Sequence, residues 1–462
     1  MNMLRSGVWL LCLVFPLAPA TVWSAERPNF LIFIADDMAW DDCGAYGHPQ
    51  IRTPNMDQLA RDGLRFDRAY LTCSSCSPSR CSILTGRYPH ATGAAELHQP
   101  LPAEQVLIAQ PLKAAGYYTA AVGKWHLGNA VKKQFDLVRE GGGPGGEEFW
   151  VETLQNRPQD KPFFFWFAST DPHRDYRPGA IDPPHTSDDV VVPPIFPDSA
   201  EVRSDLALYY DEIGRLDEYI GKVLVELDRQ GQRDNTLVLL LSDNGRPFPR
   251  CKTTVYEDGV RTPFIARYPN GISQPGSVNG QLVSSIDIVP TLLELAEQPP
   301  LATHQGKSFA PLFKQPDRPT RHAAYSEHNW HDYQAFERSV VTERFRYVRN
   351  WQPQLPGTPP ADAVRSPTYV TMQKLRDADQ LTPLLKHCFA TPRPEEELYD
   401  VTVDPHCLHN LVDNPAYAAE LSTLRNLLTT WQSETDDAFP GTEHLTPDGF
   451  DRETGLRLPK QK

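Results

Sequence analysis

The chain has 462 residues, with 45 Lys and Arg against 59 Asp and Glu, and its formal net charge is −14 at pH 7. A chain of this length can bury a large core, which predicts one large domain and a smaller one. The acidic balance argues against nucleic acid as a partner, because binding to a phosphate backbone needs clustered Lys and Arg. A polyanionic substrate is still compatible with the acidic net charge, provided that basic residues cluster at the binding site and outweigh that charge locally.

The first 25 residues have the pattern of a secretory signal peptide. Arg5 precedes an apolar run from Val8 to Pro16, and the small residues Ala18 and Ala20 follow. The run is shorter than the roughly 20 apolar residues of a membrane span. We therefore expect residues 1–25 to be removed and the mature protein to be periplasmic or secreted, without stable membrane insertion. A retained N-terminal anchor is the alternative.

Short apolar runs alternate with helical patterns along the first 320 residues, which is typical of an α/β fold with a mostly parallel sheet. The runs that predict buried strands are Asn29–Ala35, Thr119–Val122, Phe163–Ala168 and Thr236–Ser242. The segments that predict helices are Pro54–Gly63, Ala103–Ala115 and Ser204–Gln230. The last of these has apolar residues at the three-and-four spacing of an amphipathic helix packed on the core.

The pattern changes after about residue 320. Ala323–Glu327 and Phe345–Asn350 predict strands of a smaller antiparallel sheet, and Ala416–Gln432 predicts a helix that covers it. The sequence therefore predicts a catalytic domain over residues 26–320 and a C-terminal subdomain over residues 321–462.

The stretch from Cys76 to Arg87 suits a helix that starts at an anion site. Ser77 is the predicted N-cap, Pro78 fits the first helical position, and Gly86 can end the helix. Cys76 would then lie at the positive end of the helix dipole. A loop cysteine beside a short helix, or one half of a disulfide, is the alternative.

Acidic side chains follow two of the predicted strands. Asp36 and Asp37 come after the first strand, and Asp243 and Asn244 come after the strand that starts at Thr236. Ligands of open α/β sheets bind beyond the carboxyl ends of the strands. Three carboxylates and an amide oxygen suit a hard cation, and calcium tolerates irregular oxygen geometry better than magnesium does. Each pair alone would also suit a helix or turn cap.

Basic side chains follow the same strand ends. Lys124 and His126 come after one strand, His173 and Arg174 after another, and Lys252 after the fourth. A single such side chain in a loop is usually only solvated. Together they make the anion pocket that a negatively charged substrate needs above a cation.

These motifs resemble those of the family-I sulfatases of the alkaline phosphatase superfamily, from about Pro28 to Asn410. The run Cys76-Ser77-Pro78-Ser79-Arg80 resembles the signature at which a formylglycine-generating enzyme oxidises the cysteine to formylglycine (3-oxoalanine). Within the family, the chain is most similar to the sulfamidases, which remove N-linked sulfate from glucosamine in heparan sulfate. That similarity is carried by Ser74–Arg80, Leu97–Gln99, Asp171–Arg174 and Ser242–Gly245 with Pro247–Pro249.

The resemblance implies an alkaline-phosphatase-like fold and a role for each site residue. It implies calcium held by Asp36, Asp37, Asp243, Asn244 and an oxygen of the modified Cys76. It implies that Arg80 holds the formylglycine hydrate, that Lys124 and Lys252 bind the sulfate oxygens, that His173 contacts the leaving group and that His126 contacts the formylglycine. His98, Glu327 and His328 are candidates for the sugar pocket, with ordinary surface or interdomain structure as the alternative for each.

Several alternatives stay open at this point. The substrate could be an O-sulfated polysaccharide, for example a marine algal glycan such as ulvan. A phosphatase or phosphodiesterase of the same superfamily would use Ser or Thr and a second metal site, and the chain has no evident second set of metal-binding histidines. A sugar-binding pseudoenzyme would keep Cys76 as a thiol. The oligomeric state, including a homodimer, is also open.

Cysteine pairing is open as well. With Cys12 in the signal peptide and Cys76 modified, six cysteines are available for disulfides, and the sequence does not choose among their connectivities. These six are Cys43, Cys73, Cys81, Cys251, Cys388 and Cys407.

Overall fold

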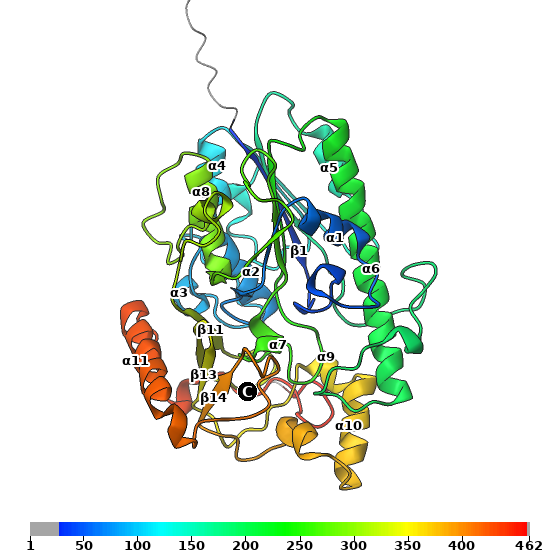
Figure 1. Cartoon of the computed structure of the whole chain (residues 1–462), viewed down its shortest axis with the longest axis vertical. Coiled ribbons are helices and arrows are strands. Elements are labelled where there is room, and N and C mark those ends of the chain that lie inside the picture. Colours follow the sequence, from blue (N-terminus) through cyan, green and yellow to red (C-terminus); the bar gives the residue numbers. More distant parts are fainter. Residues whose placement is uncertain (1–26, 460–462) are drawn as a thin grey trace, which may run out of the picture.

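The computed structural model describes residues 27–459, so the predicted signal peptide over residues 1–25 lies outside the described residues. A large sheet flanked by helices occupies one end of the molecule, and a smaller sheet lies at the other (Figure 1). Of the helices in residues 27–459, none has both the length and the apolar character needed to cross a membrane.

The large sheet is mostly parallel, as predicted. Its strand β1 pairs in parallel with β6 and β7, and β8 runs antiparallel to both of its neighbours. The strands, in their order across the sheet, are β5 (Leu137–Glu140), β4 (Tyr118–Gly123), β6 (Phe163–Ala168), β1 (Asn29–Ala35), β7 (Thr236–Ser242), β8 (Phe264–Arg267), β2 (Leu64–Phe66) and β9 (Ser277–Asn279).

Continuous apolar runs form the central strands because both faces of the sheet are covered. All seven residues of β1 are buried. Phe30, Ile32 and Ile34 enter the core on one face, and Leu31 and Phe33 enter the core on the other. This pattern is typical of parallel strands between two helical layers. Burial of each large apolar side chain contributes about 1.5–3 kcal/mol relative to exposure.

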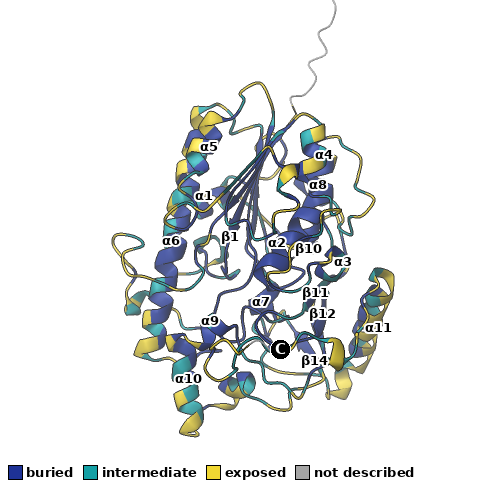
Figure 2. Cartoon of the chain, turned by 180° about the vertical axis from the view of Figure 1, so that it is seen from behind, coloured by how far each residue is buried: buried dark blue, intermediate teal, exposed yellow. Residues whose placement is uncertain are grey.

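Two groups of helices cover the sheet (Figures 1 and 2). The first core contains side chains of α2 (Cys76–Thr85), α4 (Ala109–Ala114) and α8 (Ile288–Leu295). The second contains side chains of α1 (Pro54–Arg61), α5 (Trp150–Asn156) and α6 (Ala200–Arg229). Figure 2 shows β1 and α2 as buried and much of α11 as exposed.

The smaller sheet is antiparallel and four-stranded, which confirms the predicted C-terminal sheet. Its helix α11 packs on it through Leu421, Leu424, Leu428 and Trp431. The domain boundary at residue 320 stays a prediction. The elements of this region are β11 (Ala324–His328), β12 (Glu337–Val341), β13 (Phe345–Asn350), α9 (Ala361–Val364), α10 (Pro367–Asp377), β14 (Glu396–Asp400) and α11 (Ala418–Thr435). The remaining short elements are β3 (Ala69–Tyr70), α3 (Pro89–Thr92), α7 (Glu257–Val260) and β10 (Val283–Ser284).

Two predicted helices have different starts in the structure. The helix predicted from Ala103 begins only at Ala109, because Pro111 lacks an N–H and is tolerated only in the first helical turn. The long helix begins at Ala200, four residues earlier than predicted. Ser199 caps it by accepting a hydrogen bond from the backbone N–H of Val202 at 3.4 Å.

The helix α2 starts at Cys76, so the prediction of Ser77 as its N-cap is wrong. Ser75 takes the N-cap position, and its hydroxyl hydrogen-bonds to the ring of His331 at 2.8 Å. The hydroxyl of Ser77 accepts a hydrogen bond from the backbone N–H of His98 instead, at 2.8 Å. Gly86 ends the helix as predicted, in the left-handed conformation with φ 68°.

All seven cysteines within residues 27–459 are free and buried. The six that the sequence left available for disulfides therefore form none in this structure. As free thiols they behave as small apolar side chains of the core.

A buried ion pair joins α7 of the large domain to the smaller sheet. The guanidinium of Arg346 on β13 donates to the Glu257 carboxylate at 2.7 Å and 3.0 Å, and also to the backbone oxygen of Val255 and the hydroxyl of Ser339. The side chain of Glu257 is only 1% exposed. The pair therefore fixes the loop after Lys252 against the second sheet.

Removing Arg346 should destabilise the protein strongly, because the buried Glu257 would keep only a hydrogen bond from the Tyr70 hydroxyl at 3.2 Å and a contact with Arg261 at 4.0 Å. We expect Arg346→Ala to lower the free energy of unfolding by about 3–5 kcal/mol in urea denaturation. The control is Arg344→Ala, which breaks an ion pair with Asp400 whose arginine side chain is 57% exposed. That variant should lose less than about 1 kcal/mol. Equal losses in the two variants would contradict this assignment.

A second link between the domains centres on His90 of α3. Its Nδ1 lies 2.9 Å from a carboxylate oxygen of Glu327 on β11, and its Nε2 lies 3.0 Å from the backbone oxygen of Thr435 at the end of α11. Both ring nitrogens therefore face acceptors, which suits a protonated imidazole. Burial lowers the pKa of His90, but the Glu327 carboxylate and then Asp437 outweigh burial and raise it above 6.5.

This link should be stronger at acidic pH. A histidine with a raised folded-state pKa contributes its full stability below the unfolded pKa of about 6.5, and loses it as the pH rises through the folded-state value. We expect His90→Gln to cost about 2 kcal/mol near pH 6 and clearly less near pH 9, in urea denaturation of both proteins at each pH. A cost that does not change with pH would exclude the charged link.

Candidate active site

The candidate site lies where the carboxyl ends of four parallel strands meet the start of α2. Asp36 and Asp37 follow β1, and Asp243 and Asn244 follow β7. The remaining site residues that the sequence predicted are Cys76 and Arg80 of α2, Lys124 and His126 after β4, His173 after β6, and Lys252 after β7.

Five of these side chains form a buried cluster of acids and their neighbours. The Cys76 sulfur lies 3.6 Å from Asp36 Oδ1 and 3.9 Å from Asp37 Oδ1. The side-chain nitrogen of Asn244 donates to Asp37 Oδ1 at 2.9 Å and to Asp243 Oδ1 at 2.7 Å, and lies 3.4 Å from the Cys76 sulfur. Asp36, Asp37, Asp243 and Asn244 are fully buried.

Two glycines let the strand ends come this close. A Cβ atom on Gly245, directly after Asn244, would lie 1.9 Å from the backbone oxygen of Asp258. A Cβ atom on Gly123, directly before Lys124, would lie 1.9 Å from the backbone oxygen of Ala168. Only glycine fits at either place, so these positions set the direction in which the chain leaves β7 and β4.

The cluster fits a hard divalent cation. Its acids offer carboxylate oxygens, and the Asn244 Oδ1 atom is buried without a hydrogen-bond partner in the described part of the chain. A half-turn of the Asn244 amide would exchange its nitrogen for that oxygen and direct one more acceptor at the acids. An all-oxygen set of this kind is what calcium or magnesium binds.

Three cations compensate the acids, of which Arg80 and Lys252 are buried and Lys124 is partly exposed. Arg80 donates from Nε to Asp243 Oδ2 at 2.6 Å and from Nη1 to the backbone oxygen of Lys124 at 2.9 Å. The ammonium of Lys124 pairs with Asp36, and that of Lys252 donates to Asp37 Oδ2 at 2.7 Å. Burial would raise the pKa of Asp36, but Lys124 and the other cations outweigh burial and lower it.

For two other members of the cluster, Cys76 and Asp243, burial outweighs the nearby cations and raises the pKa. It raises the pKa of the Cys76 thiol to about 12, although Lys124 and Lys252 oppose it. An unmodified Cys76 is therefore a neutral thiol and a weak nucleophile. Burial also raises the pKa of Asp243 to about 6, although Arg80 lowers it.

The two predicted catalytic histidines lie on different sides of the cluster. His126 contacts His98, with 2.7 Å between ring nitrogens. Burial, followed by the charges of Lys124 and Arg80, lowers the pKa of His126 to about 3, so this ring is neutral at neutral pH. The His173 Nε2 atom lies 3.9 Å from Asp37 Oδ2, and its Nδ1 atom contacts the backbone oxygen of Arg174.

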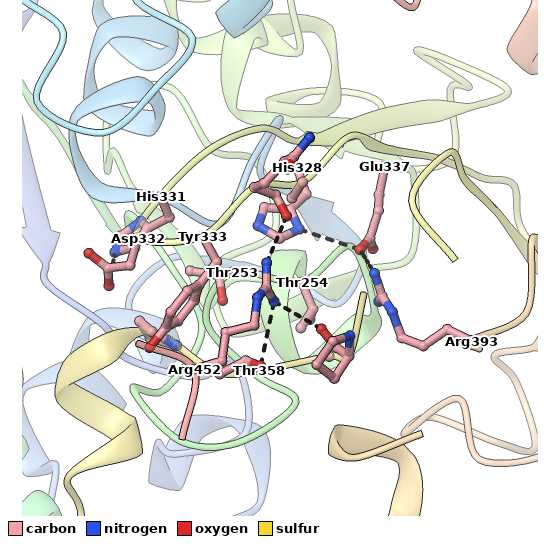
Figure 3. Close-up of a pocket in the computed structure, with 15 residues that line it drawn as sticks. Thr253, Thr254, His328, His331, Asp332, Tyr333, Glu337, Thr358, Arg393 and Arg452 are labelled. Atoms are coloured by element: carbon pink, nitrogen blue, oxygen red, sulfur yellow. Dashed lines mark hydrogen bonds and ion pairs between the residues drawn. The ribbon is translucent and has the colours of Figure 1, made fainter. Parts of the chain in front are cut away.

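The three residues predicted for the sugar pocket lie at three different places in the structure. His98 lies beside His126, as described above. Glu327 is fully buried, and its carboxylate contacts His90 and Asn329. It therefore lies in the link between the domains and not on the lining of a described pocket. His328 lines a pocket that begins directly after Lys252 (Figure 3).

That pocket is lined by residues from the large-sheet part of the chain and from the part that contains the smaller sheet. Thr253 and Thr254 come from the loop after Lys252, and His331 and Asp332 come from the segment after β11 (Figure 3). Its two arginines are already engaged: Arg393 pairs with Glu337, and Arg452 pairs with Asp448. The pocket therefore offers hydroxyl and imidazole groups and the carboxylate of Asp332.

One acid at the site was missed by the sequence analysis. Asp362, on the short helix α9, places its Oδ2 atom 3.8 Å from His173 Nε2. It belongs to no motif and does not follow a predicted strand, and the chain separates it from His173 by almost 190 residues. Only the packing of the C-terminal part against the strand ends reveals it.

Comparisons with known proteins agree with this geometry. The sulfatase family model matches residues 28–143 and 148–298, and a model described as N-sulphoglucosamine sulphohydrolase, C-terminal, matches residues 250–355. Human N-sulphoglucosamine sulphohydrolase is 32% identical over 483 residues, covering 92% of this chain and 93% of its own. An ulvan-active sulfatase of Formosa agariphila is 30% identical over 473 residues, covering 89% of this chain and 76% of its own.

A solved structure, described as a complex with its substrate D-glucosamine-2-N,6-O-disulfate, has the same fold. Its TM-score is 0.72 at 21% identity, and the match covers 91% of this chain and 100% of the other. The family match extends over more than half of the chain, and the human relative aligns along almost all of it. The chain therefore belongs to the sulfatase family and is a hydrolase of sulfate esters or sulfamates.

Proposed function

We propose that this sulfatase removes the N-linked sulfate from a glucosamine residue of a heparan-sulfate-like glycan. The observation that carries the proposal is the similarity of residues 250–355 to the C-terminal region of N-sulphoglucosamine sulphohydrolases. This region contains Lys252 of the candidate site and His328 and His331 of the adjoining pocket. Residues that contact the sugar would come from this segment.

The nucleophile in this proposal is a formylglycine made from Cys76. Its hydrate supplies an oxygen nucleophile and a second hydroxyl through which the aldehyde can be restored, which an ordinary serine cannot do. The start of α2 suits the modified side chain, because the helix dipole favours negative charge there. Arg80, one helical turn further along, would hold the modified side chain.

Calcium is the proposed metal. Asp36, Asp37, Asp243 and Asn244 would hold it together with an oxygen of the modified residue 76. A bound cation would acidify the nucleophile and neutralise charge on the sulfate oxygens. The buried, unpartnered Asn244 Oδ1 and the irregular set of carboxylates support calcium over magnesium.

The remaining residues position charge and protons around the sulfate. Lys124 and Lys252 would bind sulfate oxygens with their ammonium groups. His173 would donate a proton to the leaving nitrogen from Nε2, since its Nδ1 is engaged with the backbone. His126 is kept neutral by burial and would accept a proton near residue 76.

We also propose that the protein is exported from the cytoplasm. The signal-peptide pattern over residues 1–25 would direct the chain to the periplasm or out of the cell. A formylglycine-generating enzyme would be its partner for modification of Cys76. The sulfated glycan is the proposed substrate partner.

A second candidate is an O-sulfatase that acts on ulvan or another sulfated polysaccharide. The similarity to the ulvan-active sulfatase of Formosa agariphila, at nearly the same identity as the human relative, favours it. Sulfatases that share one sulfate site can differ in sugar and linkage through a few pocket residues.

The proposed activity is tested by sulfate release from a panel of substrates. We expect N-sulfoglucosamine to be hydrolysed faster than O-sulfated monosaccharides and ulvan oligosaccharides. Cys76→Ser should fold normally but lose turnover, and mass spectrometry of the wild-type Cys76 peptide should show the aldehyde. Activity on the O-sulfated compounds alone would refute the sulfamidase assignment, and full activity of Cys76→Ser would refute the nucleophile.

The proposed metal site is tested by thermal unfolding after chelation. Adding calcium should raise the melting temperature of the wild-type protein, because a ligand of the folded state stabilises it. Asn244→Ala should need about 10- to 100-fold more calcium for the same rise, as expected for loss of one group of a metal site. Asn414→Ala, an exposed amide outside the cluster, is the control. An equal calcium response in Asn244→Ala would rule out Asn244 as a ligand.

A further inference from the structure

Asp362 is a carboxylate that the scheme above leaves without a role. It lies on α9, yet its Oδ2 atom is 3.8 Å from Nε2 of His173. Its Oδ1 atom accepts a hydrogen bond from the backbone N–H of Ala363 at 2.7 Å, which fixes the direction of the carboxylate. The side chain is 19% exposed, so it is not sealed in the core.

The surroundings of Asp362 keep it ionised. Burial raises its pKa, but Lys252, His173 and Arg174 outweigh burial and lower it. Of these, Arg174 is occupied by two hydrogen bonds to Asp205, at 2.7 and 2.8 Å. Asp362 therefore faces the site as a carboxylate whose Oδ2 accepts no hydrogen bond within residues 27–459.

The position of Asp362 relative to His173 places it at the leaving atom. If His173 Nε2 donates the proton to that atom, the leaving atom lies within a hydrogen bond of Nε2. Asp362 Oδ2 flanks the same nitrogen, so it lies near the leaving atom, and it also lies within the electrostatic influence of Lys252. A carboxylate at this place discriminates between leaving groups.

An N-sulfate and an O-sulfate present different atoms to that carboxylate. The sulfamate nitrogen carries a hydrogen and can donate to Oδ2, whereas the bridging oxygen of a sulfate ester has no hydrogen to donate. On cleavage, the S–N electron pair stays on nitrogen, which takes the His173 proton, while the sulfuryl group passes to the oxygen nucleophile at residue 76. With the His173 proton, either leaving group departs neutral, as an amine or as an alcohol. The amine then takes a further proton from water and becomes cationic, whereas the alcohol stays neutral.

We propose that Asp362 is a specificity-determining residue that favours N-linked over O-linked sulfate, because its carboxylate accepts a hydrogen bond that the sulfamate nitrogen can donate and the ester oxygen cannot. This inference rests on the proposed function and names the group that selects the linkage. A site that hydrogen-bonds one substrate atom discriminates strongly against a substrate that lacks the hydrogen.

The test compares two linkages on one sugar. We expect Asp362→Asn to lower kcat/KM for N-sulfoglucosamine by about 10- to 100-fold, the range expected for a hydrogen bond to a charged acceptor. The kcat/KM for glucosamine 6-sulfate should stay constant or rise. Asp379→Asn removes one negative charge from an exposed position and is the matched control. An equal loss on both substrates would assign Asp362 only to charge balance around Lys252 and would overturn the proposal.

Product binding gives a second readout that needs no turnover. Glucosamine carries a cationic amine at C2, and 2-deoxyglucose is the same sugar without that amine. By calorimetry, Asp362→Asn should bind glucosamine at least about tenfold more weakly than the wild-type protein does, and should bind 2-deoxyglucose as the wild-type protein does. Unchanged glucosamine affinity would overturn the role of Asp362. A wild-type enzyme that cleaves only O-sulfated sugars would instead contradict the proposed function, so the two failures are distinct.

Discussion

The structure depends on one electrostatic constraint: three carboxylates are fully buried side by side at the ends of β1 and β7. Like charges in a low-dielectric interior repel one another, and each also loses its hydration. Asp36, Asp37 and Asp243 are tolerated because Arg80, Lys124 and Lys252 reach them directly. These cations come from α2, from the end of β4 and from the loop after β7, so the balance of charge ties three separate parts of the fold to one point.

The common direction of the parallel strands brings these acids and cations together. Because β1, β4, β6 and β7 run the same way, the residues that follow them collect at one edge. Gly245 and Gly123 let neighbouring backbone segments approach each other where the strands end. The smaller domain is then held against that edge by the Arg346–Glu257 pair and by the His90–Glu327 contact. The proposed sulfate end of the site therefore follows from the direction of the strands and the packing of the two sheets.

The sequence predicts what local patterns determine. Apolar runs identified the central strands, and reactive side chains directly after them marked the residues that the structure brings together. The predicted N-cap of α2 was wrong, because Ser75 takes that position through its extended backbone without a capping hydrogen bond from its side chain, and its hydroxyl instead contacts the distant His331. Glu327 and Asp362 could not be placed, since each acquires its position from a partner far away in the chain. Glu327 turned out to bind His90, and Asp362 reached His173 through the packing of α9.

The proposed sulfate end and leaving-group end of the site therefore differ in how well they should tolerate substitutions. The proposed sulfate end uses residues whose charges compensate one another, so replacing one leaves another without its partner. The proposed leaving-group end uses Asp362 of the short helix α9 and the segment around His331. A change at the proposed leaving-group end would alter which leaving atom and which sugar are favoured while the sulfate end stays intact. This separation is a physical reason why relatives of similar identity carry names that refer to glucosamine N-sulfate in one case and to ulvan in another.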